Sequence, residues 1–351
     1  MSFFSIEDLH INLGEFYLRE VFFGLAKGDY MMIIGPTGAG KTILLESIVG
    51  FWKPDRGRII LDGRNITHEL PEKRNIGIVY QDYALLPHFS VYDNIAYGLK
   101  KKGRNNLKSH VLEVADALHI GHLLHRKPAT LSGGEQQRAA VARALVVEPK
   151  LLLMDEPLSA LDPQTRRETR RLLRQAVRKR DTTVIHISHD LNDAWALANK
   201  IAIFKEGLLL QFGTLEEVFS RPKTRFIADF VGASIFHGTA RHNGQDACSI
   251  DCGDFELTSI DKVGNGAEVQ VALRPENIII SKDRPEDTTD ANIVGGKLED
   301  IVAEGRARFL TLKVGTTELS VLVTNNAWEH LDVAPGDNVY AIIDHSHVRI
   351  V

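Results

Sequence analysis

The segment from Gly35 to Thr42 has the composition of a phosphate-binding loop. It reads GPTGAGKT and comprises Gly35, Pro36, Thr37, Gly38, Ala39, Gly40, Lys41 and Thr42. Glycines let the backbone curl around a phosphate group, so that successive N–H groups point at its oxygens. In such a loop Lys41 neutralises the β- and γ-phosphates, and the Thr42 hydroxyl is a ligand for Mg²⁺. The segment therefore predicts a site for a nucleoside triphosphate and its metal ion.

Two adjacent carboxylates complete the chemistry of hydrolysis. Asp155 ends the apolar run that begins at Leu151, which places it at the carboxyl edge of a buried strand. An acidic side chain there can hold Mg²⁺ directly or through water. Glu156 comes next and is expected to point elsewhere, because side chains alternate at a strand end. A second carboxylate at this position suits the orientation and polarisation of an attacking water molecule.

A second glycine motif, LSGGEQQ, lies between the loop and the carboxylates. It contributes Ser132, Gly133 and Gly134, followed by a predicted helix over Glu135–Leu145. A hydroxyl and two glycines at the start of a helix form a second anion site of the helix N-terminus type.

Taken together, these motifs resemble those of the ATP-binding-cassette (ABC) ATPases, and the resemblance covers roughly residues 3–232. It implies a two-chain sandwich in which Ser132 of one copy meets the γ-phosphate that Lys41 of the other copy holds. It also implies that ATP and Mg²⁺ are the bound species. Closure of this sandwich then precedes hydrolysis.

The same resemblance assigns roles to three further positions. Gln81, in VYQD, matches the glutamine that reaches Mg²⁺ and water and senses the transport partner. His189, in ISHD, matches the histidine that contacts the γ-phosphate. Asp162 ends the stretch SALD, which matches the loop linking the two ATP sites. The family also stacks adenine on an aromatic residue before the phosphate loop; the matching position is Leu13, with Phe16 nearby, and either arrangement stays open.

The elements around these motifs predict an α/β sheet that is mainly parallel. Short apolar runs alternate with helical stretches, as expected for parallel strands joined by helices. A helix is expected from Lys41, and the strands are Tyr30–Ile34, Ile76–Tyr80, Leu151–Met154 and Thr183–Ile187.

Helical patterns interrupt this alternation between about residues 84 and 148. Val91–Leu99 and Leu107–Leu118 have helical spacing and predict an inserted helical segment. Further on, Asp162 followed by Pro163 is a strong helix start, and this helix is expected to run to Arg180. Its run of arginines indicates either a solvated helix surface or, as the alternative, a face for nucleic acid.

From residue 236 to 351 the pattern changes to short β-type runs separated by turns. Gly266–Ile280 and Gly336–Ile350 match at a constant offset, which indicates an internal repeat and predicts two small barrels of the oligomer-binding type. This part resembles the TOBE/MOP-type regulatory arm of importer ATPases. Thr289–Ile301 looks like the start of a molybdate-binding β unit: Asn292 and Gly296 match, whereas Ala291 replaces an arginine, and the loss of that cation argues against oxyanion binding.

Composition limits the remaining choices. The net charge of −4 argues against general affinity for nucleic acid, and two cysteines are too few for a disulfide framework. The sequence has neither a basic-then-apolar leader at Met1 nor an apolar stretch long enough to span a bilayer. The resemblance to importer ATPases implies a location at the cytoplasmic face of the cell membrane, where partner subunits hold the chain.

The expected fold is an α/β P-loop ATPase domain over residues 1–232 with a helical insert, followed by an all-β domain over 236–351. The expected function is that of the ATP-hydrolysing subunit of a prokaryotic ABC importer. Its partners are a second copy, integral membrane permease subunits and, indirectly, an external solute-binding protein. The motif context most resembles the molybdate/tungstate group; importers of sulfate, ferric iron, polyamines or sugars are alternatives, and a non-transport ABC ATPase is a more distant one.

Overall fold

The apolar runs that the sequence marks as strands form the parallel part of a mixed sheet. The computed structural model describes every residue except 1, 102, 104, 243–246 and 287–289, and the chain divides into Met1–Leu215 (unit 1) and Glu216–Val351 (unit 2). Neighbouring parallel strands in unit 1 are β9 (Lys200–Lys205), β3 (Tyr30–Ile34), β8 (Thr183–Ile187), β7 (Leu151–Asp155) and β6 (Ile76–Val79). Strands covered on both faces read as continuous apolar runs, which explains their visibility in the sequence.

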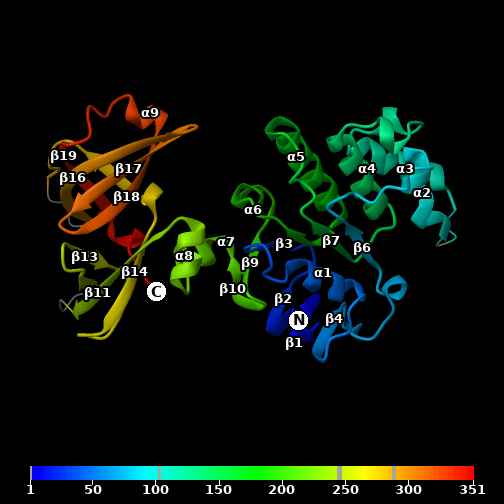
Figure 1. Ribbon diagram of the computed structural model, residues 1–351, viewed down its shortest axis with the longest axis horizontal. Helices are drawn as coiled ribbons and strands as arrows, with labels where there is room; N and C mark the ends of the chain where they lie inside the picture. Colours follow the sequence, from blue (N-terminus) through cyan, green and yellow to red (C-terminus); the bar gives the residue numbers. More distant parts are fainter. Residues whose placement is uncertain (1, 102, 104, 243–246, 287–289) are drawn as a thin grey trace. The chain divides into compact units, whose positions relative to one another are not determined.

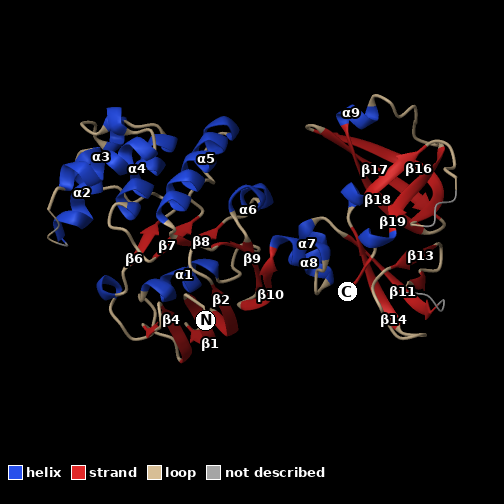
Figure 2. Cartoon of the chain, turned by 180° about the vertical axis from the view of Figure 1, so that it is seen from behind, coloured by secondary structure: helices blue, strands red, loops and turns tan. Residues whose placement is uncertain are grey.

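The other half of this sheet contains antiparallel pairs and was not predicted. It extends the order from β9 through β10 (Leu208–Thr214), β2 (Tyr17–Leu25), β1 (Phe4–Asn12), β4 (Arg56–Leu61) and β5 (Arg64–Asn65). Helix α1 (Lys41–Val49) lies between this half and the parallel half (Figure 2). Its Leu44 and Ile48 belong to one buried cluster with Leu9 of β1 and Ile33 of β3. The core thus holds α1, and with it the phosphate loop, from both sides.

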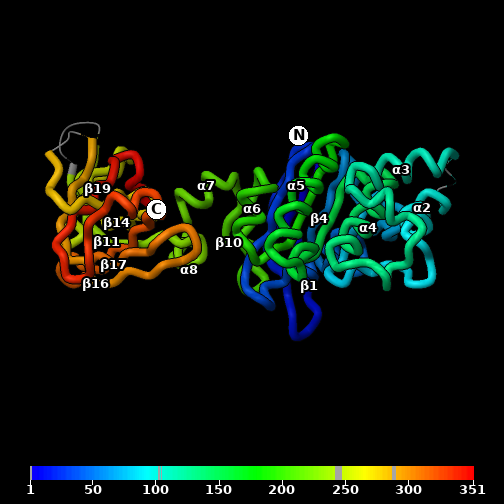
Figure 3. Tube along the Cα trace, turned by 90° about the horizontal axis from the view of Figure 1, so that it is seen from above, coloured from blue at the N-terminus to red at the C-terminus, as the bar shows by residue number. Residues whose placement is uncertain are grey.

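The predicted helical insert is confirmed. Among the described residues between β6 and β7 the regular elements are helical: α2 (Val91–Lys101), α3 (Leu107–Ala117), α4 (Gly133–Leu145) and the 3₁₀ turns η2 (Gly121–Leu123) and η3 (Pro128–Thr130). These helices group together in unit 1 (Figure 3). The turn η1 (Pro71–Lys73) precedes β6, and α5 (Pro163–Arg180) and α6 (Leu191–Leu197) complete unit 1. The predicted bounds of the insert stay a prediction.

Helix α5 begins and ends where the sequence indicates. The Asp162 carboxylate accepts hydrogen bonds from the backbone N–H groups of Gln164 and Thr165, and Pro163 occupies the first helical position. A proline there loses no intrahelical hydrogen bond. The helix ends at Arg180.

Unit 2 combines short helices with two antiparallel five-stranded sheets. It contains the greater part of α7 (Leu215–Ser220), together with α8 (Arg225–Val231) and α9 (Asn325–Trp328). One sheet has the order β13 (Glu256–Ser259), β12 (Cys248–Asp251), β11 (Ser234–His242), β14 (Glu268–Leu273), β20 (Arg349–Ile350). The other has the order β15 (Ile278–Ser281), β19 (Asn338–Asp344), β16 (Ala291–Glu304), β17 (Ala307–Val314), β18 (Thr317–Thr324). Figure 1 labels β11, β13 and β14 of the first sheet and β16, β17, β18 and β19 of the second. The predicted domain limits, at residues 232 and 236, stay a prediction.

The internal repeat reappears as a reciprocal exchange of strands between the two sheets of unit 2. In the first copy, β14 is followed by the turn η4 (Pro275–Asn277) and β15; in the second, β19 is followed by η5 (His345–His347) and β20. β15 pairs with β19, whereas β20 pairs with β14. Each repeat therefore places its last strand in the sheet of the other. The prediction of a repeated β domain is confirmed, and this exchange was not foreseen.

The residues that resemble a molybdate-binding unit have internal structural roles. The Asn292 side-chain oxygen accepts from the Thr258 N–H at 2.6 Å, and its amide nitrogen donates to the carbonyls of Thr258 and Ile343. A Cβ atom at Gly296 would lie 2.6 Å from the Lys313 carbonyl oxygen, so this glycine allows a close approach of backbones. Thr289, at the start of the motif, lies outside the described residues. Both described positions are thus explained by the packing of strands.

Within the described residues, no helix combines the length and the apolar character that crossing a membrane requires.

Candidate nucleotide-binding and hydrolysis site

The phosphate loop connects β3 to α1, and two of its glycines are fixed by their surroundings. A Cβ atom at Gly35 would lie 2.1 Å from the backbone oxygen of Phe204, which no side chain tolerates. Gly40 has a left-handed φ of 96°, and a Cβ there would lie 2.9 Å from a ring carbon of Phe16. Glycine adopts that conformation without steric cost. These glycines therefore let the loop follow a path that other residues would block.

The loop opens into a cavity of about 280 Å³ at the start of α1. Among the described residues, no side chain caps the first turn of this helix, so its N–H groups are open to a ligand. Such a helix end attracts anions. The cavity is lined by Phe16, Thr37, Gly38, Ala39, Gly40, Lys41, Thr42, Ile43, Gln81, Asp155, Glu156 and Ile187. Most residues predicted for ATP and Mg²⁺ thus meet in one place.

Lys41 is held by the loop to which it belongs. Its ammonium group donates hydrogen bonds to the carbonyl oxygens of Gly35 and Pro36, each at 2.8 Å. Burial lowers the pKa of Lys41, while the carboxylates of Glu156 and Asp155 act in the opposite direction. Burial disfavours the charged form of a lysine, and a neighbouring anion favours it. A phosphate group is such an anion, so the largely buried Lys41 is suited to binding a polyanion.

Two oxygen-bearing side chains of the kind that Mg²⁺ prefers meet at this cavity from two different elements. The Thr42 hydroxyl donates to a carboxylate oxygen of Asp155 at 2.9 Å, which joins the start of α1 to the end of β7. Burial raises the pKa of Asp155, and the neighbouring Glu156 adds to this shift, against the Thr42 hydrogen bond and the charge of Lys41. A carboxylate in this position gains from a divalent cation. The Gln81 side chain lines the same cavity and brings a further oxygen.

The backbone of Glu156 has an unusual conformation directly after the end of β7. β7 ends at Asp155, and Glu156 has a φ of 42°, a left-handed value that is uncommon for a residue other than glycine. Its N–H donates to the Ile187 carbonyl at 3.0 Å, and its carboxylate lies 3.3 Å from Nδ1 of His189. Glu156 and Asp155 both line one cavity.

The second glycine motif forms a separate feature of unit 1. Ser132 caps α4: its hydroxyl accepts from the Glu135 N–H, and the Glu135 carboxylate accepts from the Ser132 N–H. Gly134 is close to α5, because a Cβ atom there would lie 2.4 Å from a methyl carbon of Thr165. Ser132, Gly133, Gly134 and Asp162 are not among the residues described as lining the cavity at Lys41. In a single chain, the predicted site residues thus form two separate groups, one around Lys41 and one around Ser132.

The structure brings Phe16, rather than Leu13, to the nucleotide cavity. The Phe16 ring packs beside Gly40 and lines the cavity, whereas Leu13 is an exposed residue that is not among the described lining residues. The sequence left both positions open.

Comparison with known proteins decides the family. A family model described as ABC transporter matches residues 18–159, and one described as TOBE domain matches residues 288–350. The chain is 41% identical over 349 residues to the molybdate/tungstate import ATP-binding protein WtpC of Pyrococcus horikoshii, with 99% of each chain covered. It is 36% identical over 311 residues to the spermidine/putrescine import ATP-binding protein PotA of Protochlamydia amoebophila, which covers 87% of this chain and 83% of that protein.

The chain belongs to the ATP-binding subunits of ABC importers.

A solved structure extends the likeness to the fold of this ABC subunit. The cbiO1 protein of Clostridium perfringens, part of the ABC transporter complex cbiONQ, aligns with a TM-score of 0.58 at 29% sequence identity. The alignment covers 63% of this chain and 91% of that one. The ABC subunit is an ATPase whose ATPase domain precedes a TOBE region.

A network of ion pairs between side chains holds the segment that contains His189 in this ABC subunit, and it was not predicted from the sequence. Arg166 and Arg170 of α5 contact the Asp190 carboxylate at 3.0 and 3.1 Å, and Arg170 also contacts Asp193. The Asp193 carboxylate accepts from the Ser188 hydroxyl at 2.7 Å. The spacing of the two arginines, four positions apart, is a signal that a helix presents them on one face. Part of the arginine run therefore anchors the segment that contains His189.

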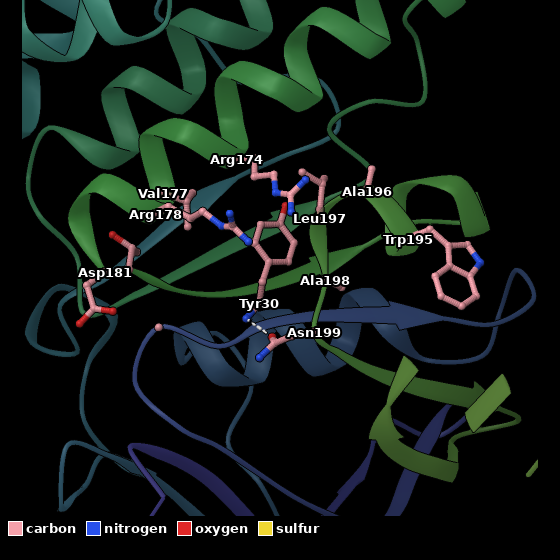
Figure 4. Close-up of a pocket in the computed structure, with 12 residues that line it drawn as sticks. Tyr30, Arg174, Val177, Arg178, Asp181, Trp195, Ala196, Leu197, Ala198 and Asn199 are labelled. Carbon is pink, nitrogen blue, oxygen red and sulfur yellow. Dashed lines mark hydrogen bonds between the residues drawn. The ribbon is translucent and has the colours of Figure 1, made fainter. Parts of the chain in front are cut away.

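Two other arginines of the run line a second hollow, of about 250 Å³. Figure 4 shows Arg174 and Arg178 extending from α5 toward the ring of Tyr30. Beneath this hollow the Tyr30 hydroxyl is 2.8 Å from Nδ1 of His186, and His186 is fully buried. The prediction that His186 packs inside its strand agrees with this position.

The buried His186 is expected to make unit 1 less stable in acid. Burial, assisted by the charge of Arg170, lowers the pKa of His186 from 6.5 to about 3. Protonation therefore favours the unfolded chain, so the stabilising effect of a neutral His186 is complete above pH 6.5 and decreases as the pH falls toward 3. At pH 5 the loss amounts to about 2 kcal/mol.

Urea unfolding of the full chain at pH 7.5 and pH 5 measures this effect. His186→Gln retains an acceptor for the Tyr30 hydroxyl but does not titrate in this range. The wild type is expected to lose about 2 kcal/mol more than this variant between the two pH values. His125→Gln, at an exposed position, serves as the control. Equal pH dependence in the wild type and His186→Gln would refute the assignment.

Proposed function

We propose that this ABC subunit hydrolyses ATP to drive the import of molybdate or tungstate. The observation that carries the proposal is the likeness to the molybdate/tungstate import ATP-binding protein of Pyrococcus horikoshii along 99% of both chains. A likeness of that extent includes the TOBE region as well as the ATPase domain. Uptake of a polyamine is the second candidate, because the spermidine/putrescine relative matches 87% of the chain at 36% identity.

The cavity at the phosphate loop fits MgATP. Lys41 and the uncapped end of α1 supply positive charge for the phosphates, and Phe16 supplies an apolar surface for the base. The Thr42 hydroxyl, the Asp155 carboxylate and the Gln81 amide oxygen are hard oxygen donors of the kind that Mg²⁺ prefers. The chemistry that Mg²⁺ would supply there is an offset to the negative charge that develops in phosphoryl transfer. These three residues would hold it.

Glu156 and His189 act on the water and the γ-phosphate. The Glu156 carboxylate orients the attacking water and accepts its proton, and His189 contacts the phosphate. Their contact of 3.3 Å supports a shared task, and the anchored segment around Asp190 limits the freedom of His189. A positioned base of this kind contributes about 10²–10⁴-fold to a rate.

A second copy of the chain completes each site. Ser132, Gly133 and Gly134 lie apart from Lys41 within a single chain, which supports a role toward the nucleotide of the partner copy. Two copies close on two ATP molecules, with Asp162 in the segment that links the sites. Hydrolysis then lets the copies separate.

The importer as a whole includes permease subunits in the membrane and an external solute-binding protein. This subunit binds the permease at the cytoplasmic face of the membrane as a peripheral protein. Residues 1–232 form the ATPase domain, and residues 236–351 form a regulatory domain. The internal roles of Asn292 and Gly296, together with Ala291 at the position of a cation, favour regulation through packing rather than through oxyanion binding.

ATP hydrolysis by the assembled importer tests the substrate. The subunit is purified together with its permease and solute-binding protein in lipid vesicles, and phosphate release is measured with molybdate, tungstate, sulfate or spermidine. Molybdate and tungstate are expected to raise the rate several-fold at micromolar concentration, because ligand-loaded binding protein favours the closed state. The same complex carrying Lys41→Ala provides the background.

The outcomes separate the candidates. Stimulation by spermidine alone would replace the oxyanion proposal by the polyamine one. Stimulation by sulfate with no response to molybdate or tungstate would indicate a different anion importer. Release of phosphate that is unaffected by Lys41→Ala would contradict the assignment of the nucleotide site itself.

A further inference from the structure

An arginine from α4 holds the loop that follows Gln81. The Arg143 guanidinium donates two hydrogen bonds to successive backbone carbonyls, one to Tyr83 at 3.0 Å and one to Ala84 at 2.7 Å. A planar guanidinium with two parallel donors fixes the direction of its partners as well as their distance. The two hydrogen bonds connect residues that are 59 and 60 positions apart in the sequence.

The backbone at this contact is strained. Tyr83 and Ala84 have φ values of 61° and 44°, so two successive residues other than glycine adopt the left-handed conformation. Such residues are rare outside glycine and persist where the surroundings hold them. Arg143 is the side chain that contacts both carbonyls. The loop conformation therefore depends on a group that belongs to α4.

The same loop is held again at its other end. Asn94 of α2 is fully buried; its side-chain oxygen accepts from the Leu86 N–H at 2.8 Å, and its amide donates to the Leu86 and Ser90 carbonyls, each at 3.0 Å. Between these contacts and β6 lies Gln81, whose side chain lines the nucleotide cavity. The helical insert thus fixes the loop, and Gln81 lies directly before this loop in the chain.

We propose that Arg143 is a positioning residue that fixes Gln81 in the nucleotide cavity and couples this cavity to the glycine-rich start of α4. α4 carries Ser132 and Gly134 at one end and Arg143 in its last turn. A displacement of α4 when its first turn binds a phosphate moves the guanidinium, and the guanidinium moves the loop. Among the described residues that line the nucleotide cavity, Arg143 does not occur. This inference rests on the proposed function, because it explains how phosphate binding at the start of α4 affects the nucleotide cavity.

A double-mutant cycle in the full-length chain tests the dependence on Gln81. Steady-state phosphate release gives kcat and KM for the wild type, Arg143→Ala, Gln81→Ala and the double variant. Each single change is expected to lower kcat about tenfold, with KM for MgATP within about twofold. In the Gln81→Ala background, Arg143→Ala is expected to have no further effect, because the residue through which it acts is already absent.

Independent losses would overturn the inference. If the double variant loses activity as the product of the two single effects, Arg143 acts through general stability or another group. Arg167→Ala, which removes an exposed arginine of α5, is the matched control and is expected to retain wild-type kcat. Should Arg143→Ala fail to fold, the cycle is repeated with Arg143→Lys, which keeps the charge but loses the two-donor fork.

The proposed function and the coupling fail in different ways. A wild type that hydrolyses ATP and a Lys41→Ala variant that does not would support the nucleotide site whatever the cycle gives. Multiplicative losses in that situation would overturn the coupling alone.

Discussion

Replacing Lys41 by alanine is expected to abolish ATP turnover, with a fall in rate of about a thousandfold or more. Lys41 is the cation that lines the cavity beside Asp155 and Glu156, and its ammonium group is held within 2.8 Å of two loop carbonyls. Without it, the two carboxylates repel the triphosphate. Phosphate release and binding of a fluorescent ATP analogue by the full-length chain measure the two effects separately.

The control for this change is another lysine of unit 1. Lys27 is exposed and pairs with Asp181 at 3.0 Å, so Lys27→Ala removes a charge away from the cavity. This variant is expected to retain wild-type turnover. Unchanged turnover in Lys41→Ala would move the nucleotide site elsewhere, because the proposed site depends on the charge of this lysine.

Replacing Glu156 by glutamine is expected to preserve ATP binding but to slow hydrolysis by about a hundredfold or more. Glutamine has nearly the same shape and keeps the contact with His189, yet it cannot accept the proton of the attacking water. Two copies therefore remain closed on bound ATP. Light scattering after addition of MgATP is expected to show a persistent dimer for Glu156→Gln and a transient one for the wild type.

A glutamate with the same backbone conformation provides the control for Glu156→Gln. Glu206 has a φ of 49°, close to the 42° of Glu156, but it lies at an exposed turn. Glu206→Gln therefore tests whether a left-handed glutamate tolerates the change, and it is expected to hydrolyse ATP normally. Full activity of Glu156→Gln would assign the general base to another group.

Local sequence predicted those parts of the site whose geometry is local. The phosphate loop requires glycines and a lysine in order, and the start of α5 requires a capping aspartate before a proline, so both could be read from neighbouring residues. The parallel strands were visible because both of their faces are buried. Carboxylates at the end of β7 followed from the same apolar run.

The remaining features depend on contacts between distant segments. The antiparallel strands β1, β2 and β4 alternate in burial and contain charged residues, so their apolar signal is weaker than that of β3. The left-handed φ of Glu156 has no signature in its residue type. The pairing of Arg166 and Arg170 with Asp190 joins residues 24 and 20 positions apart, and the sequence shows charges without showing their partners.

The exchange of strands in unit 2 carries a consequence for how this region is assembled. Because β15 completes the sheet of the second repeat and β20 completes that of the first, neither repeat is structurally self-sufficient. A polypeptide that contained one repeat alone would expose unpaired strand edges, and the last strand of a second such polypeptide could pair with them. The tandem arrangement therefore has the topology of an intertwined pair whose two members are joined in one chain.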